Sequence, residues 1–122
     1  MKRLIIIAML LTCPAAWAAE LTASWYSVDS LKAEGSWEKW KGVTSSGETF
    51  MDSRDTAACN LYPVGTCLRV TSLNSGRSVV VRVNDKIARR FGKTRIDLSK
   101  GAFQKISDLG RGLEKVRIEE VI

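Results

Sequence analysis

Short apolar runs separated by polar turns dominate the pattern of hydrophobic and polar positions after residue 19. Residues 67–73 alternate around Leu68 and Val70, and residues 79–83 form a β-branched run. The Asn-Ser-Gly sequence at 74–76 between them favours a tight turn. The two runs therefore predict a β-hairpin.

Three more short runs predict strands, at residues 23–27, 95–98 and 116–118. Only one segment of the chain has a clear helical period. One short helix among about six short strands is typical of a small β-barrel and differs from an alternating βαβ pattern. The pattern therefore predicts a mainly β fold.

The segments outside these strands predict one loop and one helix. Residues 28–49 are polar, are interrupted by glycines, and predict a long loop. Residues 100–109 place apolar side chains on one helical face, with Ser99 as an N-cap and Gly110 at the position of a C-terminal stop. We expect a helix over this stretch.

The beginning of the chain has the order of a secretory signal. Two basic residues precede an unbroken apolar run over residues 4–11, and Ala-Trp-Ala at 16–18 fits the rule for signal cleavage. The sequence predicts a signal peptide over residues 1–18 and one domain over residues 19–122. The apolar run is shorter than the roughly 20 residues of a spanning helix, so no stable membrane insertion is expected.

The cysteines predict one covalent cross-link. Cys13 leaves with the signal peptide, and Thr12 before it makes a poor lipidation signal. Cys59 and Cys67 remain, and an even pair in an exported protein predicts a disulfide. The alternative, a zinc site, has only two such ligands and no histidine in the chain. No metal or other cofactor is therefore expected.

The charge of the chain is moderately basic, with a net charge of +6 from 19 basic and 13 acidic residues. Without the two basic residues of the signal, 17 remain against 13, a net charge of +4. This excess suits an anionic wall polymer or a membrane surface, and many ordinary soluble domains carry it too. No nucleic-acid motif accompanies it, so we expect no binding to nucleic acid. We also expect the protein to be a monomer.

Three pairs of stretches, in this order, resemble the rare lipoprotein A family of bacterial lytic transglycosylases. They are residues 23–26 with 44–50, residues 56–59 with 63–71, and residues 76–85 with 95–99. The chain is more distantly similar to expansins and barwin-like proteins. The resemblance implies a small six-stranded double-psi β-barrel with one or two short helices.

The family resemblance also implies an exported enzyme, periplasmic or secreted, that acts on peptidoglycan glycan strands. Such enzymes cleave the MurNAc–GlcNAc bond without water and leave a 1,6-anhydro sugar. The reaction needs a proton donor and a proton acceptor, and Asp85 and Asp97 match the family's aspartates. The structural alternative is that Asp97 supports the start of a helix and that Asp85 is a turn residue.

The candidate substrate-binding residues are aromatic or lie in the matching motifs: Trp25, Tyr26, Trp37, Trp40, Glu48 and Arg82. Aromatic faces can stack on sugar rings, but one of Trp25 and Tyr26 is expected to belong to the core. Trp37 and Trp40 lie in a charged segment and are the better binding candidates.

The sequence departs from the family at two places near the expected site. Cys59 stands where the family has a histidine, and residues 86–89 read Lys-Ile-Ala-Arg where the family has Arg-Gly-Pro-Phe. A cysteine held in a disulfide cannot move protons. Two other hypotheses therefore stay open: a non-catalytic, expansin-like glycan-binding module, and a barwin-type secreted inhibitor or effector of a partner protein.

Overall fold

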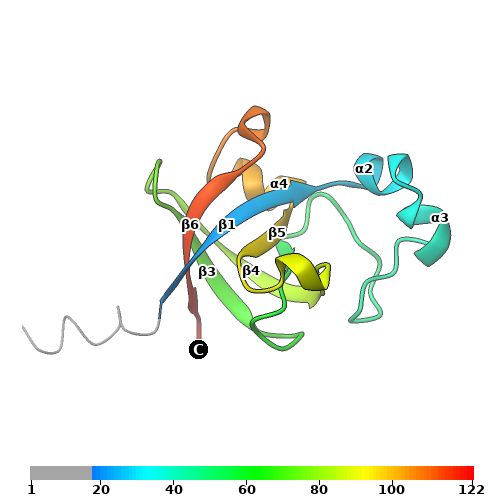
Figure 1. Ribbon diagram of the computed structural model, residues 1–122, viewed down its shortest axis with the longest axis horizontal. Helices are drawn as coiled ribbons and strands as arrows, with labels where there is room; N and C mark the ends of the chain where they lie inside the picture. The colour runs from blue at the N-terminus through cyan, green and yellow to red at the C-terminus, as the bar shows by residue number, and fades with distance from the viewer. Residues whose placement is uncertain (1–17) are drawn as a thin grey trace, which may run out of the picture.

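The computed structural model describes residues 18–122, and its six strands close into a barrel (Figure 1). Around the barrel the strands follow the order β1-β5-β2-β4-β3-β6. The predicted signal peptide, apart from Ala18, and the question of lipidation at Cys13 lie outside the described residues.

The strands have 3 to 8 residues and the α-helices 5 or 6. The strands are β1 (Ala19–Tyr26), β2 (Thr56–Ala58), β3 (Cys67–Ser72), β4 (Ser78–Asp85), β5 (Arg95–Ser99) and β6 (Glu114–Glu120). The helices are α2 (Val28–Ala33), α3 (Ser36–Trp40) and α4 (Lys100–Gln104), with 3-10 turns η2 (Arg89–Phe91) and η3 (Leu109–Arg111).

The barrel has two parallel strand pairs, β1 with β5 and β2 with β4, and its other neighbours are antiparallel. The predicted hairpin is β3–β4, and its turn closes with a hydrogen bond from the Gly76 amide to the Ser72 carbonyl of 3.0 Å. The predicted double-psi β-barrel fold is confirmed.

The core fills the barrel with the inward-facing side chain of every second residue. In β4, Val79, Val81 and Val83 are buried while Val80 is exposed, as the period of two requires. Phe103 and Ile106 are fully buried in the same core cluster. The barrel therefore gives β1, β4 and β5 a rigid frame, and their outer faces and ends are available for a site.

The prediction of a loop over residues 28–49 is wrong in its first half, which contains α2 and α3. Ser27 caps α2 by accepting from the Ser30 amide, and the Ser30 hydroxyl in turn accepts from the Ser27 amide. This reciprocal capping stabilises a helix of only 6 residues whose side chains are all outside the core. A helix with no buried face leaves no apolar period in the sequence.

The helix predicted over residues 100–109 is present but ends earlier. Ser99 is its N-cap and accepts from the Ala102 amide at 3.2 Å, as expected. The helix stops at Gln104, and after two tight hydrogen bonds to the Phe103 carbonyl the chain turns toward η3. Within residues 18–122, no helix is long and apolar enough to cross a membrane.

The prediction of a Cys59–Cys67 disulfide is wrong, because both residues are free cysteines. β4 lies between β3, which begins at Cys67, and β2, which ends just before Cys59. Cys67 pairs with Arg82, and the Cys59 amide donates to the Asp85 carbonyl. Two strand spacings already separate the chains by roughly 9–10 Å. A disulfide needs Cα atoms within about 7 Å.

Candidate active site

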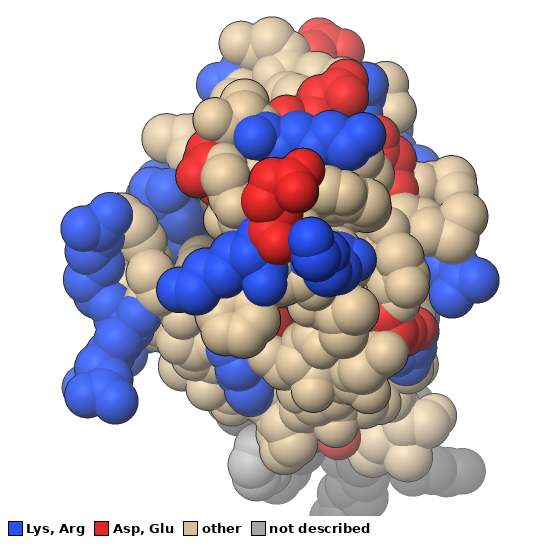
Figure 2. Space-filling model, turned by 90° about the vertical axis from the view of Figure 1, so that its right-hand side faces the viewer, with Lys and Arg blue, Asp and Glu red and all other residues tan. Residues whose placement is uncertain are grey.

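A groove of about 1090 Å³ runs across one end of the barrel. Its walls are α2 and α3 on one side and residues 86–91 on the other, and the outer faces of β1 and β5 line its floor. Figure 2 looks onto the end of the molecule that carries α2 and α3, where basic side chains surround acidic and uncharged surface. Asp85 and Asp97, the two predicted acids, both line this groove.

Asp97 lies in β5 on the outer face of the barrel. Strand pairing places it opposite Ser24 of β1, whose hydroxyl donates to Asp97 Oδ1 at 3.0 Å. Burial raises the pKa of Asp97 to about 6, against the Ser24 hydrogen bond and the Arg95 charge, which lower it. A carboxyl with such a pKa can carry and release a proton near neutral pH.

Asp85 ends β4 and is fixed by the loop that faces it. Its Oδ1 accepts from the Ser45 hydroxyl at 2.7 Å, from the Ser45 amide at 3.2 Å and from the Lys86 amide at 2.8 Å. Three donors on one oxygen hold the carboxylate in a single orientation. Within the described residues, all three of these hydrogen bonds fall on Oδ1 and none on Oδ2.

Glu48 and Arg82 do not line the groove, although both were predicted to bind substrate. They form an ion pair of 2.9 Å, and Asn84 Nδ2 also donates to Glu48 at 2.9 Å. The hydrogen bonds from Arg82 and Asn84 lower the pKa of Glu48 to about 2. This pair fastens residues 44–50 to β4, and thereby holds Ser45 against Asp85.

Tyr26 lines the groove from the end of β1, with its ring stacked on Phe50 at a centroid distance of 4.4 Å. Its hydroxyl is buried and finds no hydrogen-bond partner among residues 18–122. Burial raises the pKa of the phenol, and the charges of Asp85 and Asp97 raise it further. Tyr26 is therefore a neutral group close to both acids.

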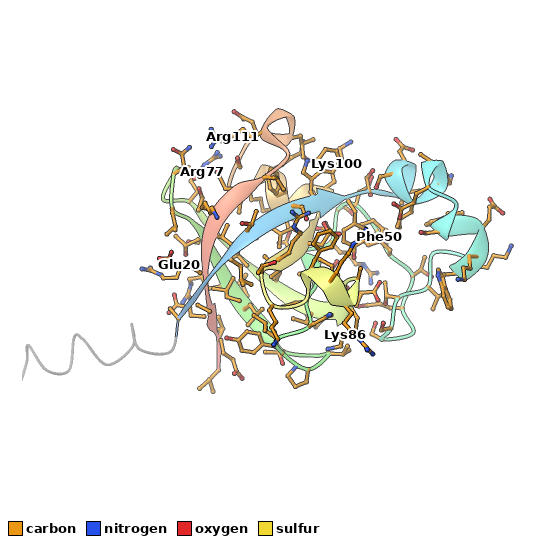
Figure 3. All side chains as sticks on the ribbon, in the orientation of Figure 1. Glu20, Phe50, Arg77, Lys86, Lys100 and Arg111 are labelled. Atoms are coloured by element: carbon orange, nitrogen blue, oxygen red, sulfur yellow. The ribbon has the colours of Figure 1, made fainter. Side chains whose placement is uncertain are left out.

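Phe50 and Lys86, labelled in Figure 3, lie on the α3 side of the barrel.

The three tryptophans predicted to contact sugar all line the groove, but they differ in exposure and in packing partners. Trp25 packs against the core, and its indole N–H donates to the Leu109 carbonyl at 3.1 Å. Trp40 is 60% exposed, and the Lys39 ammonium lies 5.0 Å from the ring centroid. Trp37 packs on the backbone of Gly42. Trp37 and Trp40 thus provide the aromatic wall, and Trp25 mainly supports it.

Replacing Gly42 with alanine should displace Trp37. A Cβ atom at Gly42 would lie 2.5 Å from the Trp37 ring, and the residue has a φ of +73°. Gly47→Ala is the matched control, because its φ is +90° but nothing lies within 4 Å. We expect Gly42→Ala to lose about 1 kcal/mol more stability than Gly47→Ala in urea unfolding. Equal losses would mean that the Trp37 contact contributes nothing.

Cys59, the residue at the family's histidine position, lies in the hydrophobic core and not in the groove, which Ala58 lines instead. The segment that follows Asp85 is held by Asn60, which donates to the Ile87 carbonyl and accepts from the Ile87 amide, both at 2.9 Å. The Lys86 ammonium donates to the Tyr62 carbonyl at 3.1 Å. These contacts fix one wall of the groove without any cross-link.

Several groove residues were not expected from the sequence, chiefly Ser24, Ser45 and Phe91. The two serines touch the aspartates only through strand pairing and loop packing, which no local pattern reveals. In the part of the chain that the structure describes, no cluster of three or more His, Cys, Asp or Glu side chains could hold a metal ion. The groove is lined by carboxyl, hydroxyl, aromatic and cationic side chains.

Comparison with known proteins identifies related sequences. A family model described as "Lytic transglycolase" matches residues 18–118. The probable endolytic peptidoglycan transglycosylase RlpA of Nostoc sp. is 46% identical over 76 residues, which is 62% of this chain and 20% of that protein. The endolytic peptidoglycan transglycosylase RlpA of Pseudomonas aeruginosa is 36% identical over 101 residues, 82% of this chain and 26% of that protein. The chain thus spans about a quarter of these relatives.

Solved structures resemble the barrel at low sequence identity. The Streptomyces papain inhibitor superposes with a TM-score of 0.65 and 24% identity, over 86% of this chain and 94% of that one. A mutant expansin of Clavibacter michiganensis, in complex with cellohexaose, superposes with a TM-score of 0.61 and 19% identity. That match covers 86% of this chain and 50% of the expansin. These likenesses concern the fold alone.

Proposed function

The chain belongs to the lytic transglycolase family, whose model matches residues 18–118, and from this membership we propose that it cleaves the glycan strands of peptidoglycan. The observation that carries the proposal is the pair of aspartates in one groove, one of them with a pKa raised to about 6. The names of the relatives, endolytic peptidoglycan transglycosylases, support the same substrate.

In the proposed reaction Asp97 is the proton donor. It gives its proton to the glycosidic oxygen as the bond between that oxygen and C1 of the muramic acid breaks. The 6-hydroxyl of the same muramic acid attacks C1, and its proton passes to Asp85. The products are a 1,6-anhydro sugar end and a free 4-hydroxyl. No water is consumed, and the proton returns from Asp85 to Asp97 through solvent.

The surroundings of the two acids suit these different roles. Asp97 is desolvated against β1 and keeps one hydrogen bond, from Ser24. Asp85 is oriented by Ser45 and by the Lys86 amide. The exposed Trp40 and the ring of Trp37 offer stacking surfaces for neighbouring sugars.

An action on peptidoglycan requires the protein to leave the cytoplasm. We therefore retain the proposal that residues 1–18 are a signal peptide and that residues 19–122 act as a monomer in the periplasm or outside the cell. Sequencing the N-terminus of the exported protein tests it, and a first residue other than Ala19 would move the cleavage site.

The direct test of the proposed activity is incubation of the exported protein with purified sacculi, followed by mass spectrometry of the soluble fragments. We expect fragments that end in 1,6-anhydro muramic acid. Fragments with a hydrated reducing end would contradict the proposed chemistry. Binding to sacculi without any fragments would favour the glycan-binding module, for which the aromatic wall of the groove is the supporting observation.

A further inference from the structure

We propose that the groove continues into a second, cation-lined cleft that binds carboxylates carried by the glycan. This inference rests on the proposed function. The second cleft has a volume of about 380 Å³. Its lining residues are Thr22, Asn74, Arg95, Arg111, Leu113, Glu114 and Lys115. Arg95 lines both the groove and this cleft, so the two are neighbours at this side chain.

Strand register aligns the second cleft with Asp97. Thr22 of β1 lies opposite Arg95 of β5 on one side and opposite Lys115 of β6 on the other. The next outward-facing pair along β1 and β5 is Ser24 with Asp97. Residues two apart on a strand share a face and are roughly 7 Å apart. A polymer that lies across Asp97 therefore meets Arg95 next.

The charges of the second cleft favour an anion. Its one acidic residue, Glu114, is buried and engaged by the Ser72 hydroxyl at 2.9 Å and by Arg111 at 3.2 Å. Lys115 donates to the Thr22 hydroxyl at 3.3 Å, and Arg95 stacks on the Phe91 ring at 4.7 Å. Among the described residues neither Arg95 nor Lys115 forms an ion pair, so both charges are available to a ligand.

The position of Arg95 also connects the second cleft with the proposed chemistry. Its charge acts on Asp97, whose pKa it lowers against the larger effect of burial. In Figure 3, Arg111 lies on the other side of β1 from Phe50, which lines the groove. Neither tryptophan of the aromatic wall lines the cationic cleft.

A carboxylate is the anion that fits this arrangement best. The proposed substrate carries carboxylates on the lactyl ether of muramic acid when it is free, and on attached peptides when it is not. A guanidinium accepts a carboxylate through two parallel hydrogen bonds, and an ammonium adds a point charge. The lactyl carboxylate and the peptide carboxylates share this chemistry. Binding of either one in the cleft would also align the glycan strand along the groove.

Binding measurements with chemically modified strands test the proposal. The probes are peptide-free glycan strands, the same strands with their carboxylates converted to primary amides, and strands that retain peptides. We expect amidation to weaken binding about tenfold, the equivalent of 1.4 kcal/mol. Arg95→Gln and Lys115→Gln should bind the acidic strands as weakly as wild type binds the amidated ones.

Arg69→Gln is the matched control. It removes one positive charge from β3, where Arg69 pairs with Glu119 at 3.8 Å and lines neither cleft. This variant should prefer acidic strands over amidated strands as strongly as wild type does. A preference that survives in Arg95→Gln and Lys115→Gln, or is absent in wild type, overturns the proposal. Tighter binding to a phosphate-bearing wall polymer than to any carboxylate strand also overturns it.

The arms of the experiment separate the two carboxylate sources and the two hypotheses. Tighter binding to peptide-free strands assigns the site to the lactyl carboxylate, and tighter binding to peptide-bearing strands assigns it to peptide carboxylates. Equal binding means that the site accepts a carboxylate from either source. Anhydro fragments without a carboxylate preference refute the second cleft and leave the activity. A carboxylate preference without anhydro fragments refutes the activity and leaves the second cleft.

Discussion

Asp97→Asn should lower the rate of anhydro-fragment release from sacculi by a factor of about 10²–10⁴, the usual contribution of a general acid. The amide has the shape of the carboxyl and can still accept from the Ser24 hydroxyl, but it cannot give up a proton to a glycosidic oxygen. The groove therefore stays intact while the proposed proton donor is lost. The measurement is the initial rate of fragment release, with circular dichroism to verify the fold.

Asp108→Asn is the matched control for this loss. It removes the same charge from an exposed residue at the start of η3, outside the groove, and should leave the rate unchanged. Asp85→Asn supplies the comparison within the groove, because it removes the proposed proton acceptor. A fully active Asp97→Asn would refute the assignment of the donor, and an active Asp85→Asn would confine both proton steps to Asp97.

Much of the barrel could be predicted because its strands follow a strict period of two. Val79 and Val83 in β4 alternate with polar or exposed positions, and the Asn-Ser-Gly turn before them has a common hairpin sequence. The N-cap at Ser99 could be predicted for the same reason, because it depends only on residues at the start of α4. Such features depend only on neighbouring residues, so one sequence suffices to predict them.

The helices α2 and α3 were missed because nothing apolar repeats along them. They are held by the Ser27–Ser30 capping box and by the packing of Trp37 on Gly42, and they do not reach into the core. A pair of serines three positions apart is a weak signal in a polar segment. Yet these helices form one wall of the groove, so the sequence described the barrel better than the site.

The two aspartates were predicted from their motifs, but their partners were not. Ser24 is 73 positions from Asp97, and Ser45 is 40 positions from Asp85. Only the parallel pairing of β1 with β5 and the folding of residues 44–50 onto β4 bring them together. The same long-range packing explains why Glu48 holds Arg82 rather than facing the groove.

The stability of the protein should fall as Asp97 ionises. Its pKa is raised from 3.8 to about 6 in the folded state, so the folded chain binds the proton more tightly than the unfolded chain. The resulting stabilisation is complete below pH 4 and is lost as the pH rises through 6. The difference corresponds to a loss on the order of 3 kcal/mol. Asp97→Asn removes this titration and should be more stable than wild type at pH 8 by about that amount.

Urea unfolding followed by tryptophan fluorescence at pH 4, 6 and 8 measures this effect as the difference between wild type and Asp97→Asn. The difference isolates Asp97 from Glu48, whose lowered pKa of about 2 acts in the opposite direction and only at acid pH. Asp108→Asn should track wild type at all three values. A difference that stays constant with pH would mean that Asp97 is not desolvated. A variant that is both inactive and more stable would mean that the fold tolerates a costly buried carboxyl for the sake of the reaction.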